Sequence, residues 1–202
     1  MARIPTENEL RKLYINKKQS LSEISKILGY KTHKVVYWMG KYKISRRGRS
    51  EANYIKANPE GEPFKIRTRL TRSEGELKYL ALGLYWGEGN KLKGYDVKVA
   101  NTDFGVIKQF KKFLIDICQV NENKIKYYLQ TFKDNDVVLA KDYWAKKLEI
   151  DPIFISSGKP TPSLGNGSYK KFSKYGVMSI CFYNTHLKAY IMNELGKLGL
   201  LR

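Results

Sequence analysis

The sequence predicts an α+β domain in residues 73–202, preceded by a small all-α helix-turn-helix domain in residues 1–45 and a basic linker in residues 46–72. Three observations predict this organisation. Short helices with recognisable starts fill the N-terminal segment, a stretch rich in Gly, Pro and charge follows it, and short strands alternate with helices from Ser73 onward. Strand and helix periodicity mixed within one segment is typical of the α+β class.

Capping boxes predict where the first two helices begin. In this motif a hydroxyl side chain and a glutamate three residues later satisfy the free backbone amides of a helix start. Thr6 begins a helix that ends near Asn16, and Ser20 begins a second helix that ends at Gly29. A third helix is predicted over residues 32–42.

Residues 21–42 have the features of a helix-turn-helix, in which the first helix supports a second helix that enters the major groove. Gly29 supplies a turn residue that tolerates positive φ, and the small Ser25 allows the helices to approach closely. The predicted shared core consists of Ile24, Leu28, Val35 and Trp38.

Basic and aromatic side chains on the outer side of this unit are the candidate DNA contacts. On the outward face of the third helix they are His33, Lys34, Tyr37 and Lys41, and just after it they are Arg46, Arg47 and Arg49. The Arg-Gly-Arg element is predicted to act as an arm in a narrow minor groove. The alternative is a helical bundle whose basic face contacts only water.

The net charge agrees with a polyanionic partner. The 202 residues contain 38 Lys+Arg and 19 Asp+Glu, which gives a formal net charge of +19. Residues 1–72 hold 18 basic and 6 acidic residues, net +12, and the remaining chain is net +7. Such an excess commonly replaces counterions on nucleic acid. The alternative is a solvated basic surface in a lysine-rich proteome.

The remaining chain is expected to alternate between helices and strands. A capping box of Ser73 and Glu76 predicts the start of the first helix. The predicted elements are helices over residues 74–88, 104–117, 137–148 and 185–195, and strands over residues 97–100, 125–132, 153–155 and 177–183.

Three features predict a cytoplasmic protein. The longest uncharged apolar run, residues 79–86, is too short to cross a bilayer, and the N-terminal residues lack the apolar stretch of a signal peptide. Cys118 and Cys181 are far apart with no CxxC spacing, which indicates a reducing compartment. No membrane partner is expected.

The helix over residues 74–88 has an unusual composition. It is apolar nearly all round and contains Gly83 and Gly87, each of which costs about 1 kcal/mol relative to alanine inside a helix. Glycines four residues apart lie on one face, where they allow another backbone to approach closely. We therefore predict a homodimer interface at Leu80, Gly83 and Gly87. Glu88, the last residue before Gly89, would meet its symmetry mate there.

This helix resembles the signature helix of the LAGLIDADG homing endonucleases, with matches at Gly83, Leu84, Glu88 and Gly89. The resemblance covers roughly residues 73–200 and implies the fold of that family, in which helices pack on a curved antiparallel sheet that lies in the major groove. It also implies a homodimer that cuts both strands of a specific double-stranded DNA site. Glu88 would be both the catalytic acid and the ligand of Mg²⁺.

Tyr85 and Trp86 depart from the family pattern at two positions of the signature. The family often has a lysine near the scissile phosphate, for which Lys98 and Lys159 are candidates, each also explicable as an ordinary solvated lysine. The alternative for Glu88 is a helix end without metal. The alternative function is a noncatalytic transcriptional regulator that uses this domain for dimerisation and DNA contact, and an RNA-binding role is a third possibility.

Overall fold

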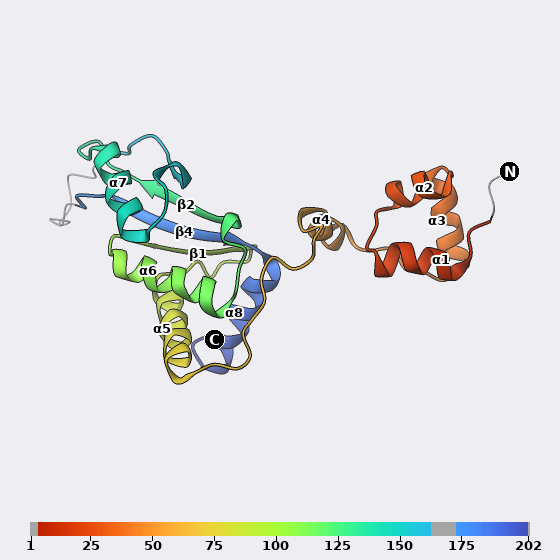
Figure 1. Cartoon of the computed structure of the whole chain (residues 1–202), viewed down its shortest axis with the longest axis horizontal. Helices are drawn as coiled ribbons and strands as arrows, with labels where there is room; N and C mark the ends of the chain where they lie inside the picture. The colour runs from red at the N-terminus through yellow and green to blue at the C-terminus, as the bar shows by residue number, and fades with distance from the viewer. Residues whose placement is uncertain (1–3, 163–172, 202) are drawn as a thin grey trace. The chain divides into compact units, whose positions relative to one another are not determined.

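The computed structural model describes residues 4–162 and 173–201 of a mixed α and β chain (Figure 1). The chain divides into two compact units, Met1–Glu62 and Pro63–Arg202. The division lies inside the segment 46–72 that the sequence predicts as a linker. Within the described ranges, no helix combines the length and the apolar character that crossing a bilayer requires.

The secondary structure of unit 1 is helical throughout its described residues. Its elements are α1 (Glu7–Arg11), a π-helical turn η1 (Lys12–Asn16), α2 (Leu21–Leu28), α3 (Thr32–Lys41) and α4 (Arg49–Ala57). The predicted caps are present, since the hydroxyls of Thr6 and Ser20 accept from backbone amides three residues later. Gly29 ends α2 with a φ of 68°, the left-handed conformation that glycine adopts without steric cost.

The core of unit 1 comes from α1 to α3 and the residues that follow them. The buried side chains are Leu10, Leu13, Tyr14, Ile24, Val35, Met39 and Ile44, and Leu28 and Trp38 pack against them. One helix, α4, forms within the segment 46–72 that the sequence predicts as a linker. This helix contains no buried residue, so its sequence lacks the apolar stripe by which a packed helix is recognised.

Unit 2 contains four helices and a four-stranded sheet in its described residues. The elements are α5 (Arg72–Glu88), β1 (Asp96–Asn101), α6 (Phe104–Lys112) with a π-helical turn η2 (Phe113–Ile117), 3-10 turn η3 (Glu122–Lys124), β2 (Ile125–Gln130), α7 (Val137–Leu148), 3-10 turn η4 (Pro152–Phe154), β3 (Ile155–Ser157), β4 (Val177–Tyr183) and α8 (Thr185–Lys197).

The sheet has the strand order β1-β4-β2-β3. The strand pairs β1–β4 and β4–β2 are antiparallel, but β2 and β3 are parallel. The expectation of a wholly antiparallel sheet is therefore wrong. The reason is topological, because the connection from β2 to β3 contains α7, and a connection through a helix can return the chain to the same direction.

Strand β3 starts later than the sequence predicts. The apolar run Ile153-Phe154-Ile155 suggests a strand, but its first two residues belong to the 3-10 turn η4 and are exposed. Pro152 opens that turn, and Asp151 caps it by accepting from the amide of Ile153 at 2.8 Å. The cap and the proline thus override the local strand preference.

Among the described residues, helices cover one face of the sheet and no helix covers the other. Alternate residues of each strand, such as Val97, Tyr127 and Ile180, are buried in a single core with side chains of α5 to α8. Residues of the opposite face, such as Lys126 and Tyr128, are exposed. We call this second surface the open face. Its strand residues are Asp96, Lys98, Ala100, Lys126, Tyr128, Gln130, Ser156, Val177, Ser179, Cys181 and Tyr183.

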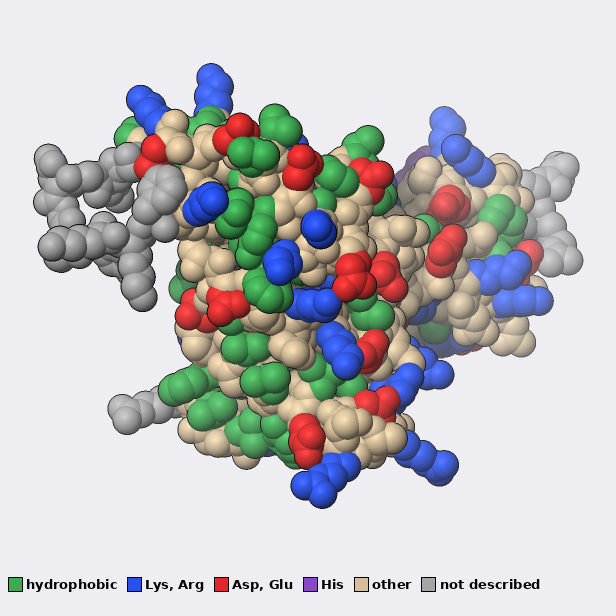
Figure 2. Space-filling view, turned by 60° about the vertical axis from the view of Figure 1, so that its left-hand side comes forward, with side chains coloured by type: hydrophobic (Ala, Val, Ile, Leu, Met, Phe, Trp, Pro, Cys, Tyr) green, Lys and Arg blue, Asp and Glu red, His purple; other side chains and the backbone are tan. Residues whose placement is uncertain are grey.

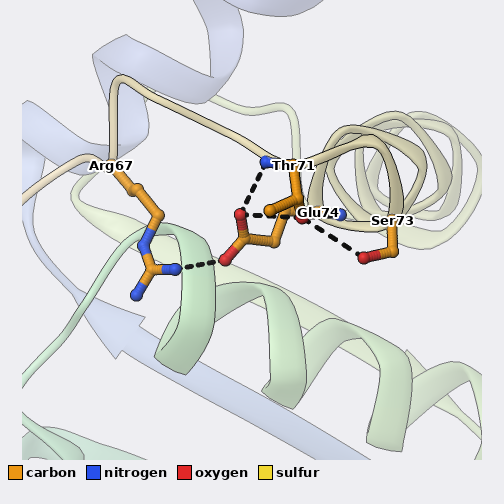
Figure 3. Close-up of polar contacts among 4 residues, drawn as sticks. All are labelled: Arg67, Thr71, Ser73 and Glu74. Carbon is orange, nitrogen blue, oxygen red and sulfur yellow. Dashed lines mark hydrogen bonds and ion pairs between the residues drawn. The ribbon is translucent and has the colours of Figure 1, made fainter.

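Helix α5 starts two residues earlier than predicted, with Thr71 and not Ser73 as its cap (Figure 3). The Thr71 hydroxyl accepts from the amide of Glu74, and the Glu74 carboxylate accepts from the amide of Thr71 at 2.8 Å. Arg67 forms an ion pair with the same carboxylate. Thr71 and Ser73 are each followed by a glutamate three residues later, and capping by Thr71 gives the longer helix.

The segment before α5 belongs to unit 2 and runs along η2. The amide of Lys65 donates to the carbonyl of Cys118 at 3.0 Å, and that of Arg67 donates to Ile117 at 2.9 Å. Phe64, Ile66 and Leu70 pack against the core of this unit. Basic and apolar residues alternate here, so that the basic side chains are exposed.

Candidate functional site

The outer face of α5 is apolar and uncovered. Leu77 and Ala81 are buried in the core, whereas Tyr79, Leu80 and Trp86 are exposed. A monomer rarely leaves large apolar side chains together on one helix face without a function. Figure 2 shows one side of the molecule, on which hydrophobic side chains lie scattered among charged ones.

Gly83 and Gly87 lie exposed on α5, with open space where a side chain would start. A Cβ built at either position has no atom within 4 Å outside its own helix. The described chain therefore gives no packing reason for glycine at these two positions, although alanine would stabilise the helix. Leu80 lies one turn before Gly83 and is 49% exposed. The structure thus brings the three predicted interface residues together on one uncovered face.

Gly89, the residue after α5, must be glycine for a steric reason. A Cβ at this position would overlap the carbonyl oxygen and the ring of Tyr85. The backbone of Gly89 has an ordinary extended conformation, with φ of −82°. Space and not backbone angle therefore requires glycine here. The sharp exit leaves Glu88 as an exposed side chain at the last position of the helix.

The exit from α5 is attached to the edge strand of the sheet. Gly89 forms an antiparallel bridge with Val99, and the amide of Asn90 donates to the carbonyl of Lys98 at 3.0 Å. Glu88 and Lys98, both predicted as site residues, are thereby brought to the same edge of the sheet. Lys98 is half-buried on the open face.

Lys159, the other predicted lysine, is not placed with Glu88. It is exposed and follows β3, whereas β1 lies at the opposite end of the strand order. The loop that continues from it includes residues 163–172, which lie outside the described residues. The pairing of Lys159 with Glu88 therefore has no support in the strand order.

Lys188 is a buried residue near this site that sequence reasoning missed. Its ammonium donates to the hydroxyl of Tyr85 at 2.7 Å, to the carbonyl of Asp96 at 3.2 Å and to the carbonyl of Asn90. Tyr85 itself donates to the carbonyl of Asn90 at 2.6 Å. The network ties α8 to the exit of α5 and gives a role to Tyr85, one of the departures from the signature.

The other departure, Trp86, also has a structural role. Its indole Nε1 donates to the carbonyl of Leu200 at 2.9 Å, which ties α5 to the chain after α8. The ammonium of Lys91 donates to the carbonyl of Trp86 at 2.5 Å and to that of Gly89 at 3.3 Å. A cation at the carbonyl end of a helix interacts favourably with the helix dipole.

Most of the predicted DNA contacts in unit 1 are exposed. They are His33, Lys34, Tyr37 and Lys41 on α3, together with Arg46 and Arg49. Val35 and Met39 lie on the opposite side of α3, in the core. The 3.6-residue period of the helix thus separates the apolar side from the basic side, as the sequence predicts.

Arg47 is an exception, because its guanidinium faces its own domain. It donates to the carbonyls of Lys18 at 3.0 Å and Gln19 at 3.2 Å, and to that of Tyr14. It also lies 4.0 Å from the centre of the Tyr14 ring. The expectation that Arg47 belongs to a free arm is therefore wrong. Its carbonyl partners lie at the end of η1 and just after it, where such groups lack helical donors.

The open face of unit 2 combines aromatic and basic side chains. Tyr128 and Tyr183 are exposed there, and Lys126 lies in the same row of the sheet as Lys98. The sequence signal for these residues was the alternation over 125–130, which separates the buried Tyr127 from the exposed Tyr128.

A single chain offers one exposed carboxylate at the α5 exit. Among the described residues, no three His, Cys, Asp or Glu side chains lie close enough together to hold a metal ion. Mg²⁺ commonly uses only one or two carboxylates together with water and substrate phosphate oxygens. The oxygen donor of Glu88 fits that chemistry if a second copy or a phosphate supplies the other ligands.

No family model, curated protein or solved structure matches this chain.

Proposed function

We propose that the protein binds double-stranded DNA as a homodimer and cleaves it with Mg²⁺ at Glu88. The observation that carries this proposal is the exposed face of α5, which has two glycines open to contact and ends in an exposed acid. A function that uses this face explains why the helix keeps glycine at two positions where alanine would be more stable.

The duplex is held first by unit 1. The exposed side of α3 carries imidazole, ammonium and phenol groups, which can reach base edges and phosphates when a recognition helix lies in the major groove. Arg46 and Arg49 follow this helix and are exposed. They supply cations beside the groove, where they contribute to a salt-dependent affinity.

Two copies of α5 would cross at Gly83 and Gly87. The absence of side chains there lets the helix backbones approach closely, and the apolar Leu80 and Trp86 supply area to bury. Each helix ends at Glu88, so a crossing in which both helices run in the same direction would place one Glu88 from each copy at the same end of the pair. Two carboxylates repel each other unless a cation lies between them.

Glu88 from each copy would hold the metal ion. When bound there, Mg²⁺ would supply Lewis-acid stabilisation of the developing phosphate charge and would activate a water. The protein fixes the position of Glu88 through the bridge from Gly89 to Val99 and through the ammonium of Lys188. Lys98 lies at the same edge of the sheet and would contact the phosphate backbone.

A noncatalytic regulator is the second candidate. The exposed recognition face of α3 is complete within one chain and needs no metal to bind DNA. In that function, α5 would still pair two copies so that they read two half-sites, and Glu88 would be a surface acid at a helix end. Both candidates bind duplex DNA, and cleavage separates them.

Sedimentation velocity tests the homodimer. We expect a dimer for the wild type and a monomer for Gly83→Leu, because the larger side chain blocks close approach at a position where an added Cβ meets no other described residue within 4 Å. Gly196→Leu is the matched control, since that helical glycine in α8 is also open and lies outside the proposed interface. A Gly83→Leu protein that remains dimeric contradicts the proposed pairing.

Cleavage is tested after a binding selection. Random duplexes selected with Glu88→Gln give the preferred site without requiring cleavage, and a plasmid that carries this site is then incubated with Mg²⁺. We expect cutting or nicking by the wild type and by Glu76→Gln, a control acid near the other end of α5, but not by Glu88→Gln. Equal binding with no cutting by any of the proteins identifies the regulator. Preference for structured RNA over the selected duplex contradicts both candidates.

A further inference from the structure

A single leucine projects from the loop that joins α5 to β1. Leu92 lies in this loop, residues 89–95, and is 76% exposed. Among the large hydrophobic residues that the structure describes, only Ile153 is more exposed. Isolated apolar residues are common on protein surfaces. This one differs because its loop is held at both ends, carries lysines and begins where α5 ends at Glu88.

Both ends of the loop are held by hydrogen bonds. At its start, the Nδ2 of Asn90 donates to the carboxylate of Asp96 at 2.7 Å, and its Oδ1 accepts from the amide of Leu92 at 3.1 Å. At its end, the carbonyl of Tyr95 accepts from the amide of Asn184 at 2.6 Å. A loop held in this way can present an apolar side chain to a partner with little loss of conformational entropy on binding.

The loop is basic and lies beside the open face. Lys91 and Lys93 are exposed on either side of Leu92. The ring centre of Tyr95 lies 5.5 Å from that of Tyr183, a residue of the open face. An apolar side chain between cations is complementary to duplex DNA, in which phosphates surround a stack of base pairs. The charge of the loop thus favours DNA as the partner of Leu92.

We propose that Leu92 inserts between two base pairs of the bound duplex, close to the position where Glu88 acts. Apolar side chains used in this way unstack one base step and kink the duplex. Pyrimidine–purine steps kink and unstack most easily, so the insertion favours such a step near the cut. This inference rests on the proposed duplex binding and adds a sequence preference that needs no hydrogen bond to a base.

The adenine analogue 2-aminopurine measures this insertion, because its fluorescence rises when the base is unstacked. The duplex selected with full-length Glu88→Gln is labelled at one position after another and mixed with that protein, which keeps the DNA uncut. We expect the emission to rise about two-fold or more at one step of each half-site. In the same background, Leu92→Ala should abolish the rise, whereas Leu92→Met should keep it, because methionine has a similar apolar volume.

Two comparisons complete the experiment. Leu139→Ala is the control for loss of an exposed leucine elsewhere in unit 2, since that residue is 61% exposed, and it should leave the rise unchanged. Leu92→Ala should weaken duplex binding by no more than about ten-fold, because the lost contact is offset by the lost cost of unstacking. A new selection with Leu92→Ala should lose the pyrimidine–purine preference and keep the rest of the site.

The outcomes separate this inference from the proposed function. Absence of duplex binding by the proteins with Leu92 intact overturns both. Tight binding with no rise in emission at any position, or with an equal rise for Leu92→Ala, overturns the insertion and leaves duplex binding in place. A change from dimer to monomer in Leu92→Ala, measured by sedimentation velocity, assigns the leucine to the partner copy and also overturns the insertion.

Discussion

The buried ammonium of Lys188 in α8 donates to the hydroxyl of Tyr85 in α5, with 2.7 Å between Nζ and Oη. The same ammonium reaches the carbonyls of Asn90 and Asp96, so one side chain joins three segments of unit 2. Burial lowers the pKa of Lys188 below its ordinary value, although the carboxylate of Asp96 acts in the opposite direction.

Lys188→Met should destabilise the protein by about 1–3 kcal/mol, because buried carbonyl groups lose a donor. Urea unfolding at neutral pH measures this change. Lys112→Met is the control, since that lysine is exposed and its loss should change stability by less than about 0.5 kcal/mol. An unchanged urea midpoint for Lys188→Met contradicts a structural role for the network.

The effect of Lys188→Met on the free energy of unfolding should also depend on pH. A lowered pKa in the folded state means that the folded protein releases the Lys188 proton at a lower pH than the unfolded chain does. Between the two pKa values the unfolded chain binds more protons, so stability rises with pH. The difference in unfolding free energy between the wild type and Lys188→Met should therefore grow as the pH rises toward about 10, the unfolded value. A difference that shrinks over this range contradicts the stated direction.

Gly89→Ala should destabilise unit 2, because the added methyl group overlaps the backbone oxygen of Tyr85. Strain from such overlap typically costs about 1–3 kcal/mol. Thermal unfolding of the variant should show a lower midpoint than that of the wild type. Gly75→Ala is the comparison, because that glycine lies in the first turns of the same helix with open space around it. Its substitution should be neutral or stabilising.

Arg47 and Arg46 should respond differently to substitution by methionine. Arg47→Met removes three carbonyl contacts and should lower stability by about 1–3 kcal/mol. Arg46→Met should leave stability unchanged and weaken duplex binding, with a salt slope smaller by about one. Denaturant unfolding and DNA titrations over a salt series measure the two effects. Equal losses of stability in both variants contradict this division.

Thr71→Ala should destabilise α5 by about 0.5–2 kcal/mol, the usual effect of losing an N-cap hydroxyl. Ser73→Ala is a matched substitution within the same turn that removes a hydroxyl but not the cap. Denaturant unfolding of the two proteins compares them directly. A larger loss of stability for Ser73→Ala would contradict Thr71 as the N-cap and indicate that Ser73 caps the helix.

Local signals predicted the elements of this chain more accurately than their connections. Val137–Leu148 and Val177–Tyr183 have the expected bounds, because Asp136 caps one segment and an apolar run forms the other. The parallel pairing of β3 with β2 was not predictable in the same way, since it depends on where a short strand docks after α7. Strand direction depends on the whole sheet, so the sequence of a three-residue strand does not indicate it.

The candidate site was predicted only in part, because contacts between residues distant in sequence leave no local pattern. Gly83 and Gly87 lie on the same face of α5, as their spacing of four predicts, and the helical period correctly placed the basic side chains of α3 outside. The buried contacts of Arg47 and Lys188 were missed, because each pairs with carbonyl groups distant in sequence. Backbone oxygens are the same at every position, so a sequence gives no sign of which one a cation will meet.

The strand order also constrains when each unit can fold during synthesis. The core of unit 1 draws on residues close together near the N-terminus, so its contacts are local and can form early. In unit 2, β4 lies between β1 and β2, although it is the last strand of the chain. Until the ribosome has released β4, β1 has no strand partner and its apolar side chains lack the sheet that buries them. During synthesis, unit 1 can therefore fold while the sheet of unit 2 is still incomplete.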